Sequence, residues 1–122
     1  MFIPESHVRV FVYGKPTDMR KSFAGLQALT KQVMQEDPLS GHVFVFINRR
    51  GTQLKSLYWD RSGFCIWAKK LERGTFVSTW NRQTNSELNW LDYKLLLEGI
   101  EPITIKKRLR FSRENMPVRT AA

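Results

Sequence analysis

The sequence predicts an α+β domain in which an antiparallel β-meander packs against one amphipathic helix. Between residues 43 and 80, short runs of β-branched and aromatic residues alternate with turn sequences, which is typical of strands joined by hairpins. Ahead of them, apolar residues recur at helical spacing. With 122 residues, of which 42% are hydrophobic, the chain can bury one core. We therefore expect a single domain over residues 1–101, followed by a basic arm over 102–122.

The first expected elements are a strand and a helix. Residues 8–13 read Val-Arg-Val-Phe-Val-Tyr and are closed by a turn at 14–16, which indicates a strand. Apolar residues then follow at spacings of four, three, three and four, as on one face of a helix: Met19, Phe23, Leu26, Leu29 and Val33. Thr17 or Asp18 is the expected N-cap of this helix. Asp37-Pro38 is its expected end, because proline disfavours helical geometry in the residue before it.

The predicted meander is centred on residues 43–47, Val-Phe-Val-Phe-Ile, which contain no polar interruption and so indicate a strand covered on both faces. The sequence then predicts a hairpin loop at 48–52, a strand at 53–59, a tight turn at 60–63, and strands at 64–71 and 76–80. Gly51 and Gly63 stand where left-handed backbone is expected in the two connections.

A second helix is predicted near the C-terminus. Thr84 and Glu87 have the spacing of a capping box, and Gly99 is the expected stop. Leucines form one side of this helix, and Trp90, Tyr93 and Leu97 make its other side apolar as well. A helix that is apolar all round should be sandwiched or should dock on a partner, so we predict these three residues as a partner-binding surface. Residues 103–111 alternate in a way that permits either a short edge strand or a basic arm that orders on binding.

The charge of the chain points to a polyanionic partner. Lys and Arg number 20 and Asp and Glu 11, which gives a net charge of +9 and an isoelectric point of about 10.1. Residues 49–73 carry 7 basic and 2 acidic side chains, and residues 102–122 carry 6 and 1. Aromatic residues are interleaved with the first of these segments, and together such groups can grip phosphates and stack on exposed bases. The alternative is that the aromatic residues belong to the core and the charged residues form a solvated face.

We predict nucleic-acid contacts in both basic segments. Arg49 and Arg50 are preferred because a loop tip can reach a groove and arginine matches phosphate or guanine with two parallel hydrogen bonds. The full predicted set is Arg49, Arg50, Arg61, Lys69, Lys70, Lys106, Lys107, Arg108 and Arg110. The four residues of the arm are expected to contact phosphates without reading sequence.

No catalytic, metal or cofactor site is predicted. His7, His42 and the lone Cys65 fit neither a zinc site nor a nucleophile–base pair by their spacing. Asp18 and Asp60 are better explained as a helix cap and a turn residue than as metal ligands. The single cysteine requires no oxidising compartment, and no signal peptide or membrane span is visible. The protein is therefore expected to be soluble and cytoplasmic.

Several short motifs occur together in a recognisable order. They are Asp18-Met19-Arg20-Lys21, Asn48-Arg49-Arg50-Gly51, Tyr58-Trp59-Asp60, Gly63-Phe64 and Lys69-Lys70-Leu71-Glu72-Arg73-Gly74. With these motifs the chain resembles the TnpB-type accessory protein encoded by the second open reading frame of bacterial insertion sequences of the sixty-six family. The similarity runs from about residue 8 to residue 76 and resumes at 96–100. After Phe76, where a Trp-Pro-like pair would be expected, the chain has Val77-Ser78-Thr79-Trp80.

The resemblance implies a role in transposition beside a separate transposase that carries the catalytic acids. It supplies no catalytic residues for this chain. Two functions follow as hypotheses. In the first, a non-catalytic accessory protein binds DNA at the ends of the insertion sequence within the transposition complex. In the second, the chain is an interaction module that recruits or regulates the transposase through apolar surface without contacting DNA.

Overall fold

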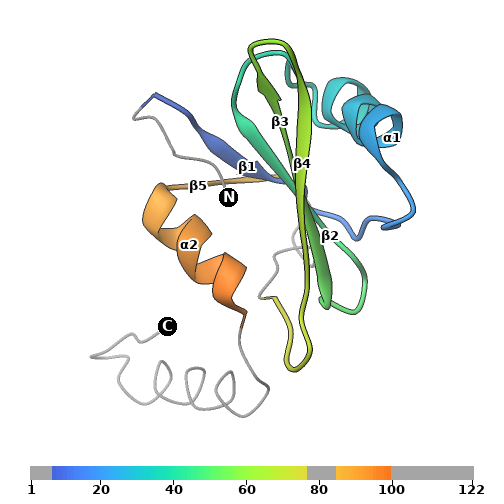
Figure 1. Ribbon diagram of the computed structural model, residues 1–122, viewed down its shortest axis with the longest axis vertical. Coiled ribbons are helices and arrows are strands. Elements are labelled where there is room, and N and C mark those ends of the chain that lie inside the picture. Colours follow the sequence, from blue (N-terminus) through green and yellow to red (C-terminus); the bar gives the residue numbers. More distant parts are fainter. Residues whose placement is uncertain (1–6, 77–84, 100–122) are drawn as a thin grey trace.

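The computed structural model describes residues 7–76 and 85–99, which form a five-stranded sheet in the order β4-β3-β2-β1-β5 (Figure 1). The strands are β1 (Val10–Val12), β2 (Val43–Ile47), β3 (Gln53–Asp60), β4 (Gly63–Lys70) and β5 (Ser86–Leu88). The helices are α1 (Phe23–Ala28), its π-helical continuation η1 (Leu29–Val33), and α2 (Trp90–Glu98). The predicted α+β class is confirmed. Within the described ranges, no helix combines the length and apolar character that a membrane span requires.

The sheet is mixed rather than wholly antiparallel. β2, β3 and β4 form the predicted antiparallel meander, but β1 pairs in parallel with β2, with Phe11 opposite Phe44. The cause is the intervening helix, which carries the chain back along the sheet so that the next strand runs in the same direction. β5 pairs antiparallel with the other edge of β1. The strand predicted at 76–80 lies mostly outside the described residues; Phe76 N–H donates to the carbonyl of Gly51 at 2.6 Å.

Side chains of the central strand alternate between two cores. All five residues of β2 are buried, and Val43, Val45 and Ile47 face the side covered by α2. Phe44 and Phe46 face the opposite side, where they pack with residues of α1, β3 and the segment after η1. Because successive side chains of a strand point to opposite faces, one continuous apolar run can serve both cores. The prediction that this strand lies at the centre of the fold is confirmed.

The first helix begins later than predicted. Thr17 N–H donates to the carbonyl of Ile47 at 2.8 Å, so the chain is still following the end of β2 at this point. Asp18 accepts a hydrogen bond from the backbone N–H of Arg20, two residues on, and so stabilises a turn rather than a helix terminus. The residue at the N-cap position is Ser22, whose side chain makes no capping hydrogen bond. The predicted cap at Thr17 or Asp18 is therefore wrong.

The buried face of this helix also differs from the predicted one. Leu26 is fully buried, but Phe23 and Val33 are 46% and 51% exposed. Thr30 is buried instead, and its hydroxyl donates to the carbonyl of Leu26 at 2.9 Å. Thr30 lies four residues after Leu26 and so shares its helical face, but a pattern of apolar residues does not identify a buried polar one. The helix ends before Asp37-Pro38, because Gln35 adopts a φ of 60°.

The second helix begins at Trp90 and not at the predicted capping box. Glu87 lies in β5, where its carboxylate accepts hydrogen bonds from the guanidinium of Arg9 at 2.6 and 2.8 Å. The actual cap is Asn89, whose side-chain oxygen accepts from Asp92 N–H at 2.8 Å. Thr84 lies outside the described residues. Residues 86–88, which the local sequence assigns to the helix, therefore form a strand because they pair with β1.

A buried polar pair links α2 to the centre of the sheet. The hydroxyl groups of Ser56 and Tyr93 lie 2.7 Å apart, and both residues are fully buried. Burial raises the pKa of Tyr93 to about 12, because the phenolate would lose its hydration. Each hydroxyl therefore depends on the other for its hydrogen bond.

We expect Tyr93→Phe and Ser56→Ala each to lower the free energy of unfolding by about 1–2 kcal/mol, because each leaves one buried hydroxyl without its partner. The double variant should lose less than the sum of the two, since both polar groups are then removed. Urea unfolding of the four proteins measures the coupling. Strictly additive losses would show that the two hydroxyls do not stabilise one another.

Candidate nucleic-acid interface

Three connections meet at one end of the sheet. They are residues 13–22 after β1, residues 48–52 after β2, and residues 71–76 after β4. β1 and β2 are parallel and β4 runs in the same direction as β2, so the C-terminal ends of all three strands lie at this end of the sheet. Hydrogen bonds hold the connections together at this end: Thr17 N–H donates to the carbonyl of Ile47, the last residue of β2, at 2.8 Å, and Leu71 N–H donates to the carbonyl of Thr52 at 2.9 Å. In Figure 1 the connections after β2 and β4 are at the lower end. We call this end of the sheet, together with the C-terminal end of α2, the basic end.

The basic end collects most of the positive charge of the described residues. Its basic side chains are Lys15, Arg20, Lys21, Arg49, Arg50, Lys69, Lys70 and Arg73, and its acidic ones are Asp18, Glu72 and Glu98. The opposite end has the reverse balance, with Arg9 and Arg61 against Glu36, Asp37, Asp60, Glu87 and Asp92. Charge is thus segregated along the strand direction, and an anion is attracted to one end of the sheet.

Arg49 and Arg50 lie at the tip of an ordered loop. The side-chain oxygen of Asn48 accepts from the backbone N–H groups of Thr52 at 2.9 Å and Gln53 at 3.1 Å, and its amide donates to the Thr52 hydroxyl at 3.1 Å. Both arginines are exposed, and neither forms an ion pair with another described residue. Two unpaired guanidinium groups are therefore held on a fixed backbone, which lowers the entropy lost when they bind an anion.

The connection after β1 is anchored beside this loop. The ammonium of Lys55 donates to the carbonyls of Met19 at 2.8 Å and Lys21 at 2.7 Å. The guanidinium of Arg20 donates to both carboxylate oxygens of Asp18, at distances of 2.6–3.1 Å. These hydrogen bonds lower the pKa of Asp18 to about 2, so its carboxylate is ionised at neutral pH and offsets the charge of Arg20.

The predicted contact residues do not form one patch. Lys69 and Lys70 point to opposite faces of the sheet, and the Lys69 ammonium donates to the carbonyl of Leu97 at 2.8 Å, where it stabilises the last turn of α2. Arg61 lies in the β3–β4 turn at the opposite end. The length of β3 separates it from Arg49 by about 25 Å. The arm residues Lys106, Lys107, Arg108 and Arg110 lie outside the described residues.

The aromatic residues of the hairpin are also separated from the basic end. Trp59 and Phe64 form an edge-to-face pair with ring centroids 5.1 Å apart, next to the β3–β4 turn. Trp67 packs against the core that lies under α2. The expected mixture of positive charge and aromatic rings in residues 49–73 is thus divided between two ends and the interior, because β3 and β4 each span the whole sheet.

Sequence reasoning missed four basic residues that the fold brings to this end: Lys15, Arg20, Lys21 and Arg73. The first three occur in a segment of the sequence whose net charge is near zero. A usable signal was present in the order strand, helix, strand over residues 8–47, which favours a parallel pair. Parallel pairing places the connection after the first strand beside the connection after the second.

The partner-binding residues predicted on α2 have different surroundings. Tyr93 is fully buried, and Leu97 is partly buried against the core. Trp90 donates its indole N–H to the carbonyl of Val8 at 3.0 Å and packs on Tyr93 with ring centroids 5.4 Å apart. The apolar side chains that α2 exposes are Leu91 and Leu95, at 67% and 55%. Tyr93 therefore belongs to the core, and the accessible apolar surface of α2 is formed by Leu91 and Leu95 on another face of the helix.

Fold and charge distribution together define a small, basic α+β protein with a cationic end formed by three loops. Within residues 7–76 and 85–99, no cluster of three or more His, Cys, Asp or Glu side chains is placed to hold a metal ion. The chain belongs to the family described as IS66 Orf2 like protein, which matches residues 8–107. Membership identifies it as an accessory protein of an insertion sequence.

Two relatives come from Sinorhizobium fredii (strain NBRC 101917 / NGR234), and both are described as uncharacterized. Protein y4jC is 31% identical over 108 residues, which cover 88% of this chain and 92% of that protein. Protein y4hO is 41% identical over 71 residues, which cover 58% of this chain and 62% of that protein. No solved structure matches the chain significantly.

The two glycines predicted to adopt left-handed backbone differ in the structure. Gly51 has a φ of 74°, and an added Cβ would lie 3.3 Å from both the Phe76 carbonyl and the Thr75 side chain. Gly63 has no positive φ and open space around it, because Arg61 takes the left-handed position of its turn at 48°. The prediction for Gly63 is therefore wrong.

We expect Gly51→Ala to destabilise the protein by about 1–2 kcal/mol, because the alanine would be held in left-handed backbone against a carbonyl. Gly63→Ala is the matched control, and it should change stability by less than about 0.5 kcal/mol. Thermal unfolding of both variants makes the comparison. Equal losses would mean that the backbone of Gly51 is not constrained by the connection after β4.

Proposed function

We propose that this accessory protein binds DNA within the transposition complex, through the basic end of its sheet, and that a separate transposase supplies the chemistry. The segregation of charge carries the proposal: eight basic and three acidic side chains gather at the basic end, on three adjoining connections and the ends of β4 and α2. A uniformly charged surface would serve solubility equally well. A surface on which the positive charges are concentrated is destabilised by repulsion between them, and a bound polyanion relieves this repulsion.

Arg49 and Arg50 are the central residues of the proposed interface. Their guanidinium groups have no carboxylate partner among the described residues, so no ion pair within that part of the chain has to break before DNA binds. Lys70 and Arg73 are exposed on adjoining segments and can add phosphate contacts. Lys69 contributes less, because its ammonium already donates to the end of α2. The arm residues at 106–110 would add further non-specific contacts.

We expect the double variant Arg49→Ala, Arg50→Ala to weaken binding to a duplex that carries the terminal repeat of the insertion sequence. The plot of log affinity against log salt should become less steep by about 0.9 for each phosphate contact that is lost. Fluorescence anisotropy across a salt series, with and without the transposase, provides the measurement.

Arg61→Ala is the control, since it removes one positive charge at the far end of β3. It should leave the salt dependence close to that of the unmodified protein. If the protein bound no terminal-repeat duplex at low salt, either alone or with the transposase, the DNA-binding proposal would fail. If Arg61→Ala and the double variant changed the slope equally, the interface would not be at the basic end.

A second candidate function is recruitment of the transposase, and the exposure of Leu91 and Leu95 on α2 favours it. These two leucines lie four residues apart, so they project from the same face of the helix. Exposed leucines at this spacing can insert into an apolar groove of another protein.

Leu91→Ser together with Leu95→Ser should weaken association with the transposase in nuclease-treated lysate by about a hundredfold or more, since each buried leucine contributes about 1.5–3 kcal/mol. The variant should fold normally, because both side chains are exposed. Lys94→Ser on the same helix serves as the control. Undiminished co-purification of the double variant would remove α2 as the contact, and loss of the complex on nuclease treatment would assign the association to DNA.

A further inference from the structure

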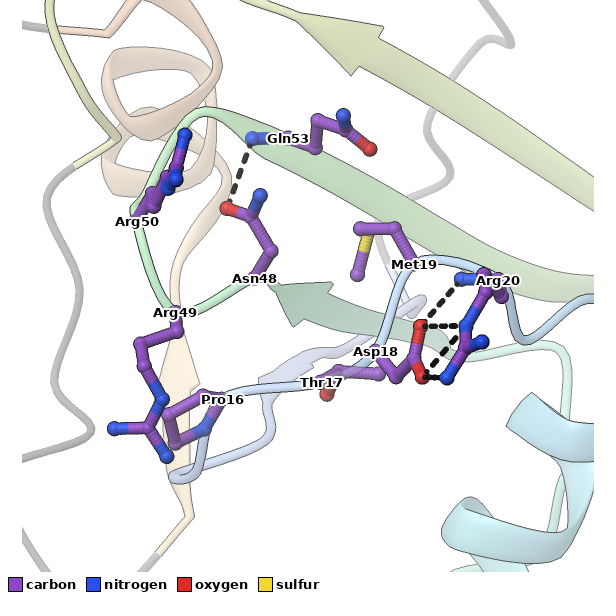
Figure 2. A pocket seen from close by; sticks show the side chains of 9 residues that line it. All are labelled: Pro16, Thr17, Asp18, Met19, Arg20, Asn48, Arg49, Arg50 and Gln53. Atoms are coloured by element: carbon purple, nitrogen blue, oxygen red, sulfur yellow. Dashed lines mark hydrogen bonds and ion pairs between the residues drawn. The ribbon is translucent and has the colours of Figure 1, made fainter.

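A pocket of about 610 Å³ lies between the connection after β1 and the connection after β2 (Figure 2). Its lining residues are Pro16, Thr17, Asp18, Met19, Arg20, Asn48, Arg49, Arg50 and Gln53. The volume falls within the range of roughly 300–1,000 Å³ that small-molecule sites occupy. The pocket also lies at the carboxyl ends of two parallel strands, which is where open sheets with parallel strands commonly bind ligands.

The charged groups of the pocket favour an anion at one side. Asp18 is already bound by Arg20, with a closest approach of 2.6 Å, so this pair contributes little net charge. Arg49 and Arg50 form no ion pair within the described residues, and Figure 2 shows both on the loop across from the Asp18–Arg20 pair. A phosphate is the anion that a pair of guanidinium groups suits best in a basic surface.

The remaining lining groups suit a nucleobase better than a bare phosphate. Pro16 and Met19 give the pocket apolar surface. The side-chain amide of Gln53 makes no hydrogen bond within the described residues and can pair with the donor and acceptor groups of a base edge. Thr17 is only 4% exposed, and its hydroxyl also has no hydrogen-bond partner within those residues. An unpaired buried hydroxyl in the wall of a pocket is uncommon, and it adds a polar group that a ligand can engage.

An intact duplex cannot place a base in such a pocket, because its bases are stacked and paired. A base must be unpaired or turned out of the helix before a pocket can receive it. The ligand class is thus a single nucleotide with its phosphate.

We propose that this pocket holds an unpaired nucleotide at the end of a DNA strand, with its phosphate on Arg49 and Arg50 and its base against Met19 and Pro16, within reach of Gln53. The inference rests on the proposed function, because the arginines that attract the duplex also form one wall of the pocket. Cutting an insertion sequence out of DNA produces strand ends, so a protein that holds an end nucleotide would mark the cut site. The basic end then has two tasks: non-specific grip by exposed charges and recognition of an end by the pocket.

The test compares two labelled duplexes of the same sequence, one blunt and one with a single unpaired nucleotide that bears a 5′-phosphate. We expect the unpaired nucleotide to tighten binding about tenfold, which is the contribution of one good amide–base contact. Gln53→Ala should remove most of this gain and leave binding to the blunt duplex unchanged. An excess of free 5′-mononucleotide should also reduce the gain.

Lys70→Ala is the matched control, because Lys70 lies directly opposite Gln53 on β4 and projects from the same face of the sheet but does not line the pocket. It should weaken binding to both duplexes by the same factor. Thermal unfolding checks that each variant is folded.

The outcomes separate the two proposals. Equal affinity for both duplexes would overturn the pocket assignment and leave DNA binding standing, whereas absence of binding to either would overturn both. Unchanged end preference in Gln53→Ala would remove the pocket as its cause. Binding of the free mononucleotide without any preference for the strand end would show a nucleotide site that does not serve DNA ends, and it would also overturn the proposal.

Discussion

Parallel pairing between β1 and β2 is the constraint on which the rest of the molecule depends. Phe11 lies opposite Phe44, and the two rings are stacked with centroids 5.7 Å apart. Because parallel neighbours cannot be joined by a tight turn, the chain must cross over the sheet, and α1 with η1 makes this crossing. The crossover covers one face and leaves the other to α2. It also brings the connections that follow β1 and β2 to the same end of the sheet.

The candidate site follows directly from this arrangement. Residues 13–22 and 48–52 are far apart in the chain, yet both line the pocket, and Thr17 donates a hydrogen bond to Ile47 at the end of β2. Several polar side chains are used to hold backbone rather than ligands: Asn48 shapes one connection, while Lys55 and Asp18 fix the other. Arg49 and Arg50 form no ion pair within the described residues. Local order and free charge are thus combined at one end of the sheet, and that combination suits a fixed surface for a polyanion.

Sequence patterns located most of the elements but gave several of their ends incorrectly. β2, β3 and β4 were predicted because long runs of β-branched and aromatic residues separated by turns leave little choice of structure. Errors occurred where a tertiary contact overrode a local signal. Thr17 continues beside β2 instead of capping a helix, and Glu87 pairs with Arg9 in the sheet instead of completing a capping box. The buried face of α1 and η1 also includes Thr30, which an apolar pattern does not identify because the residue is polar.

By itself, the sequence determined the α+β class, the buried central strand, the excess of positive charge and the family, because composition and short motifs are properties of the chain alone. The tertiary structure decided which charges act together. Lys69 and Lys70 are adjacent in sequence but on opposite faces, Arg61 is separated from Arg49 by the whole length of β3, and Arg20 and Arg73 join the basic end from distant segments. Strand direction and crossover connection fix these positions, and neither is encoded in the order of charges along the chain.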